Sequence, residues 1–131
     1  MNINPNDFSI DQSNIDNELC SLGSKMFQYG ETEGEWRVNL DRDKSDLEFT
    51  EAVLDADIRN KAKESGSKKT EAQIKNEIIQ DPLYKQSLDK LMEDQDRYNR
   101  IKAAMVALSA KRDCLIALSY RDRQMMKTNV Y

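Results

Sequence analysis

The residues of this chain best suited to chemistry form a basic run between Arg59 and Lys75, which only Glu64 and Glu71 oppose. Lysine and arginine side chains neutralise phosphate groups and release the counterions condensed on a nucleic-acid backbone. The run therefore predicts electrostatic, sequence-independent binding of nucleic acid, while a lysine-rich helix end also suits the negative end of a helix dipole without any ligand. The basic residues of this candidate site are Arg59, Lys61, Lys63, Lys68, Lys69 and Lys75.

Catalytic chemistry has few candidates in this chain. It contains no histidine, which removes the usual general base, the usual zinc ligand and the Ser-His and Cys-His nucleophile pairs. It also lacks a glycine-rich phosphate loop, and Cys20 and Cys114 are too far apart for metal-ligand spacing. We therefore expect no enzyme activity, no metal site and no cofactor. Carboxylates are abundant, but their helical spacing predicts a solvated helix face in place of an acid/base or metal site. These residues are Asp41, Asp43, Asp46, Glu48 and Glu51.

The composition favours narrow apolar contacts between helices over a large hydrophobic core. The 131 residues are 38% hydrophobic and 34% charged, a balance typical of helical hairpins and oligomers. The longest apolar run is far below the roughly 20 residues of a membrane span, and the N-terminus lacks a signal-peptide pattern. We expect a soluble, cytoplasmic protein that makes no contact with a membrane.

Charge is distributed unevenly along the chain. Residues 1–57 hold 4 basic and 14 acidic side chains, whereas residues 58–131 hold 16 basic and 10 acidic ones. An acidic front and a basic back indicate contact between like subunits or an anionic ligand at the back. The alternative explanation of this uneven charge is that two helix faces of opposite charge attract one another within one hairpin.

The elements that must position these charges are all helices, so we predict an all-α fold. Residues 1–10 read as a flexible leader, and residues 11–131 as a single helical domain. The first helix is expected over 11–30, and glycines at 30 and 34 predict a break after it. Leu40, Leu47 and Leu54 recur every seven residues and predict a coiled-coil-like helix over 35–64, which Gly66 ends.

Two further helices follow. Thr70 and Gln73 have the spacing of a capping box, which predicts a short helix over 70–80. Asp81 and Pro82 are an N-cap and a first-turn proline, and an apolar stripe then predicts a long helix over 82–128. That helix would be roughly 70 Å long, so it must lie against other long helices.

The helix order, together with two short segments, resembles the UvsY-like recombination mediator proteins of tailed phages. The likeness runs from about Trp36 to Lys127 and includes the Glu-Ser-Gly turn at 64–66 and the Ala-Leu-Ser-Ala-Lys-Arg-Asp segment at 107–113. In that family a ring-like homo-oligomer binds single-stranded DNA and helps a RecA-type recombinase displace a single-strand-binding protein. The resemblance implies the same function here, in the cytoplasm of a phage-infected or prophage-carrying bacterial host.

The resemblance also implies roles for particular residues. Arg59 and Lys61 match most nearly the family's DNA-binding basic residues near the end of the second helix. One departure is that the second helix here is very acidic before Ile58, which restricts DNA contact to the hairpin tip and beyond. Oligomerisation through the C-terminal helix would place in a subunit interface the residues Ile101, Met105, Leu108, Leu115 and Leu118.

A structural role is the other interpretation. A phage scaffold, an adaptor or a coiled-coil chaperone would use the same charges only to set helix pairing. DNA binding that weakens steeply with salt would favour the mediator, and an oligomer that ignores DNA at low salt would favour the assembly protein.

Overall fold

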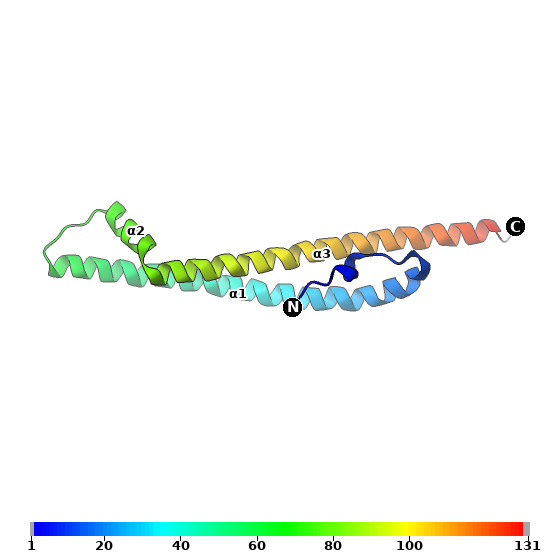
Figure 1. Cartoon of the computed structure of the whole chain (residues 1–131), viewed down its shortest axis with the longest axis horizontal. Coiled ribbons are helices and arrows are strands. Elements are labelled where there is room, and N and C mark those ends of the chain that lie inside the picture. Colours follow the sequence, from blue (N-terminus) through cyan, green and yellow to red (C-terminus); the bar gives the residue numbers. More distant parts are fainter. Residues whose placement is uncertain (1, 130–131) are drawn as a thin grey trace. The chain divides into compact units, whose positions relative to one another are not determined.

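The structure is a computed structural model that describes residues 2–129 (Figure 1). Two short 3-10 helices, Pro5–Phe8 and Gln12–Asn14, precede three α-helices. These are α1 (Ile15–Glu64), α2 (Glu71–Gln80) and α3 (Pro82–Asn129). No strand occurs within residues 2–129, so the prediction of an all-α fold is confirmed.

The predicted break after the first helix is wrong. The helices expected over 11–30 and 35–64 are one continuous helix, α1, and its first α-helical residue is Ile15. Glycine in a helix interior costs only about 1 kcal/mol relative to alanine, and packed flanks can supply more than that. Tyr29 and Leu40, on either side of the expected break, are both buried. The helix therefore continues through Gly30 and Gly34.

The end of α1 follows the predicted glycine stop. Gly66 has a φ of 69°, the left-handed conformation that closes a helix. Its N–H donates to the carbonyl of Lys63 at 3.2 Å, and the N–H of Ser67 donates to the carbonyl of Ala62 at 2.9 Å. This pair of bonds is a Schellman motif, which satisfies carbonyls that the helix end leaves open.

The predicted starts of α2 and α3 are also confirmed. The side chain of Thr70 accepts a hydrogen bond from the N–H of Gln73, and the side chain of Gln73 accepts one from the N–H of Thr70. At α3, Oδ1 of Asp81 accepts from the N–H of Leu83 at 2.8 Å, with Pro82 as the first helical residue.

The described residues group into two compact units, and the single domain expected over 11–131 stays a prediction. Residues of Met1–Glu35 and Asn99–Tyr131 make up unit 1, and Trp36–Tyr98 make up unit 2. Both α1 and α3 contribute to each unit, because each of the two helices passes from one unit into the other. The candidate basic residues all belong to unit 2.

Unit 1 has a seam of buried apolar residues between the first part of α1 and the second part of α3. Leu22 and Tyr29 of α1 are almost fully buried, and so are Leu108 and Leu115 of α3. Within each helix the two residues are seven positions apart, about two helical turns, which keeps them on the face that packs against the other helix. The apolar stripes of α1 and α3 therefore pack against each other within one chain.

The N-terminal segment is packed onto unit 1, so the expectation of a flexible leader over 1–10 is wrong. The Tyr29 hydroxyl donates to Oδ2 of Asp7 at 2.7 Å and accepts from the N–H of Asn4 at 3.3 Å. Lys25 forms an ion pair with Asp7 at 3.2 Å. The hydrogen bond from Tyr29, supported by Lys25, lowers the pKa of Asp7. A buried hydroxyl that needs a partner thus orders a segment whose composition is typical of a loop.

Candidate nucleic-acid interface

The six candidate basic residues lie on three successive pieces of unit 2. Arg59, Lys61 and Lys63 are on the last turns of α1, Lys68 and Lys69 are on the connection to α2, and Lys75 is on α2. All six residues are exposed. The helix α2 lies beside the C-terminal part of α1 (Figure 1), where Ile74 and Ile78 pack in one buried cluster with Leu54. This apolar packing places the charged residues of α2 close to those of α1.

A groove of about 400 Å³ brings three of these residues together. We call it the tip groove. Its polar lining comes from Arg59, Asn60, Lys63, Ser67 and Lys69, and its apolar lining from Ala56, Ala62 and Ile74. Lys61 and Lys68 are not part of that lining. Lys75 lies instead beside a hollow of about 280 Å³ that is lined mostly by acidic and apolar residues, among them Glu48, Glu51 and Glu71.

Arg59 is held by two carboxylates of its own chain. Its Nε donates to Oδ1 of Asp55 at 2.7 Å, and its Nη2 lies 2.8 Å from both carboxylate oxygens of Glu71. These hydrogen bonds, first to Glu71 and then to Asp55, raise the pKa of the guanidinium above its ordinary value. Arg59 therefore stays charged, and it connects the end of α1 to the start of α2.

Two of the lysines are also paired. Lys61 lies 3.0 Å from Asp57, and the hydrogen bond with Asp57 raises the pKa of the lysine. Lys69 pairs with Glu77 of α2. Within residues 2–129, Lys63, Lys68 and Lys75 form no ion pair with a carboxylate. Half of the predicted basic site is thus neutralised locally.

The acidic partners change the charge of the site. Only Glu64 and Glu71 fall within the run from Arg59 to Lys75, but Asp55, Asp57 and Glu77 pair with its cations as well. Residues 55–77 hold six basic and five acidic side chains, a net charge of +1. Two of these pairs could have been found from the sequence, because Asp55 and Asp57 precede their partners by four residues. The pair between Lys69 and Glu77 depends on how the connection folds back.

The predicted subunit interface is largely used within the chain. Ile101, Leu108 and Leu115 are already buried within unit 1 of the single chain, and their place in a subunit interface stays a prediction. Met105 and Leu118 are half-buried. The physical reason is that the same stripe of α3 meets α1 of its own chain. A second set of apolar residues on α3 is exposed instead, including Val106, Ile116 and Tyr120.

One residue of the expected solvated face lies in the interior. Asp43 is only 3% exposed and interacts with Asp94, which is 5% exposed. Burial first, and then Asp94, raises the pKa of Asp43, although Lys90 lies 3.6 Å from its Oδ1. Asp43 falls between Leu40 and Leu47 on the apolar stripe, and this spacing was the signal that the sequence interpretation missed.

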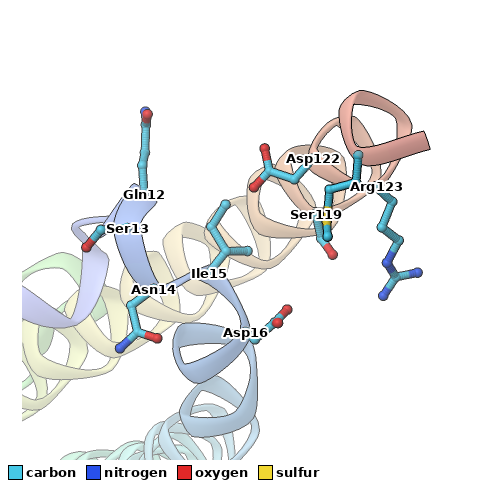
Figure 2. A pocket seen from close by; sticks show the side chains of 9 residues that line it. Gln12, Ser13, Asn14, Ile15, Asp16, Ser119, Asp122 and Arg123 are labelled. Carbon is cyan, nitrogen blue, oxygen red and sulfur yellow. The ribbon is translucent and has the colours of Figure 1, made fainter. Parts of the chain in front are cut away.

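A second hollow, of about 320 Å³, lies in unit 1 where the start of α1 faces the last turns of α3 (Figure 2). Its charged lining mixes signs, since Asp16 and Asp122 accompany Arg123. Neither a basic surface nor an apolar pocket results, so this hollow adds nothing to the nucleic-acid interface.

The part of the chain that the structure describes has neither a metal-binding cluster nor a membrane-spanning helix. No three histidine, cysteine or carboxylate side chains within it come together in a way that could hold a metal ion. None of its helices combines the length and the apolar character needed to cross a membrane. Comparison with protein-family models, with curated proteins and with solved structures found no match to this chain.

Proposed function

We propose that this protein binds single-stranded DNA electrostatically through the tip groove and its neighbouring lysines. The observation that supports this most directly is that Arg59, Lys63 and Lys69 line one groove. Lys68 and Lys75 are exposed nearby and unpaired with carboxylates within the described residues. A flexible single strand can bring successive phosphates to such separated cations and release counterions.

Binding of this kind would depend little on base sequence. The lining of the tip groove contains no aromatic side chain on which a base could stack. Asn60 and Ser67 can donate hydrogen bonds to phosphate or sugar oxygens. The contacts would therefore go mainly to the backbone of the strand.

A net charge of +1 at each tip makes binding by one chain weak. Repetition of the site in a homo-oligomer would raise the affinity through effective concentration. We propose that the functional form is such an oligomer, and that it assists a RecA-type recombinase against a single-strand-binding protein. This wider role rests on the resemblance to UvsY-like mediators and on no feature of the tip groove.

The test is fluorescence anisotropy of a labelled oligo-dT at two salt concentrations, with light scattering to fix the mass of the protein. The variant Lys63→Gln with Lys68→Gln removes two cations without breaking an ion pair of the structure. We expect a loss of about tenfold in affinity and a salt slope shallower by about 1.4, or 0.7 for each lost contact. The matched control is Lys44→Gln with Lys85→Gln, two exposed lysines elsewhere in unit 2.

An assembly protein is the second candidate, and the pairing of Arg59, Lys61 and Lys69 with carboxylates of the same chain favours it. In that case the charges serve helix packing and need no ligand. A multimer that leaves oligo-dT unbound even at low salt would support this candidate and remove the DNA-binding proposal.

A further inference from the structure

We infer that Glu71 and Glu77 occupy phosphate positions in the tip groove, so that nucleic acid binds there by displacing these two carboxylates of α2. This inference rests on the function proposed above and adds its regulation: the free protein holds its own site in a neutralised state. The structure supports each step through contacts within unit 2.

The contact of Glu71 with Arg59 has the form of a phosphate contact. Both oxygens of the carboxylate lie 2.8 Å from Nη2 of the guanidinium. A phosphodiester presents two charged oxygens in a similar arrangement, and guanidinium groups bind carboxylate and phosphate with the same type of charge-assisted hydrogen bond. A phosphate that binds Nη2 of Arg59 must therefore displace Glu71 from this donor.

Glu77 has the equivalent role at the second cation. It pairs with Lys69, which lines the groove together with Arg59 and Lys63. Lys63 has no carboxylate partner among residues 2–129. One helix, α2, thus supplies the carboxylates for two of the three groove cations and leaves the third available for a first phosphate.

The exchange is feasible because both ion pairs are in contact with solvent. The side chain of Arg59 is 45% exposed and that of Glu71 75%, while those of Lys69 and Glu77 are 33% and 43% exposed. Ion pairs with this much exposure contribute little to stability, so a polyanion with several phosphates can replace them.

The fold can tolerate the loss of these two pairs. Ile74 and Ile78 are buried against Leu54, which keeps α2 on α1 through apolar contacts. The capping box of Thr70 and Gln73 satisfies the start of α2 independently. Displacement would release two side chains and leave the helix in place.

The experiment compares the wild-type protein with the variant Glu71→Gln/Glu77→Gln in oligo-dT anisotropy across a salt series. Glutamine keeps the shape of each side chain and removes its charge. We expect affinity at low salt to rise about tenfold, because the variant has no carboxylates to displace, and the salt slope to stay the same, because both proteins contact the same phosphates. Circular dichroism should show unchanged helix content.

The control variant is Asp46→Asn/Glu93→Gln. It makes the same change of net charge in unit 2 with two exposed carboxylates that form no ion pair in the described chain and line neither hollow of the basic site. An equal gain in both variants, or no gain in either, would overturn the inference while wild-type binding leaves the proposed function standing. Absence of binding by all three proteins would remove the proposed function itself, and the inference with it.

Discussion

Nζ of Lys111 donates a 2.8 Å hydrogen bond to the backbone carbonyl of Asp7, which joins two positions 104 residues apart. The same nitrogen forms an ion pair with Glu18 at 2.9 Å. The side chain of Lys111 is only 3% exposed, although it sits on the apolar stripe of α3 between Leu108 and Leu115. A buried ammonium group needs such partners, so it holds the N-terminal segment on unit 1.

Replacing this lysine should therefore loosen the N-terminal segment. Lys111→Met keeps an unbranched side chain that is one atom shorter, but leaves the Asp7 carbonyl and Glu18 without their cation. We expect a loss of about 2 to 3 kcal/mol in the free energy of unfolding, measured by urea denaturation. Hydrogen exchange should also quicken at the amides of residues 4–8. The control is Lys127→Met on the exposed end of α3, and equal unfolding midpoints for both variants would contradict the assigned role.

The buried carboxylate in unit 2 predicts how stability depends on pH. Burial first, and then Asp94, raises the pKa of Asp43. The folded state therefore holds a proton that the unfolded state releases, and stability falls as pH rises from about 4 through the raised pKa. Acidification from neutral pH should therefore raise the free energy of unfolding, until the carboxyl of the unfolded chain is protonated as well.

Asp43→Asn tests that dependence. The amide cannot ionise, so we expect stability at pH 7 to rise by about 1 kcal/mol and its slope against pH to flatten. Thermal unfolding at several pH values between about 4 and 8 measures both effects. Asp41→Asn, at an exposed neighbouring position, should change little. A destabilised Asp43→Asn protein would show that the charged carboxylate is favourable in its place.

Leu108 distinguishes a core within one chain from an interface between chains. It is fully buried in unit 1, so Leu108→Ala should cost about 3 kcal/mol in unfolding free energy. Light scattering under native conditions should give the same mass as the wild type. A reduced mass with an unchanged unfolding midpoint would instead place this residue between subunits.

Glycine substitutions test the continuity of α1. A Cβ added at Gly34 would meet no atom within 4 Å, and the backbone there is helical. Gly34→Ala should therefore stabilise the protein by about 1 kcal/mol in chemical denaturation. Gly66→Ala provides the opposite control, because its φ of 69° disfavours a side chain. Destabilisation by Gly34→Ala would mean that the helix bends at this residue.

Local signals in the sequence identified most of the helix boundaries. The capping box at Thr70, the Asp81 cap and the stop at Gly66 each satisfy backbone groups with residues two to five positions away. Such contacts form as soon as the helix forms, so the pattern is sufficient to predict them. The pairing of Arg59 with Asp55 is a four-residue contact of the same local kind.

Contacts between distant segments decided the features that local sequence patterns did not predict. The break expected after Tyr29 did not form because packing on both sides of the glycines outweighs their small helix cost. The pairing of Lys69 with Glu77, the burial of Asp43 and the docking of Asp7 on Lys111 all depend on where another segment lies.

The sequence by itself determined that the chain is helical, where α2 and α3 start, where α1 stops, and that its cations gather near Gly66. Tertiary structure alone decided that α1 covers the apolar stripe of α3 and that carboxylates of α2 pair with two of the three cations of the tip groove. The physical reason is that periodicity shows that a helix face must be covered, but the covering surface is chosen by the free energy of non-local packing.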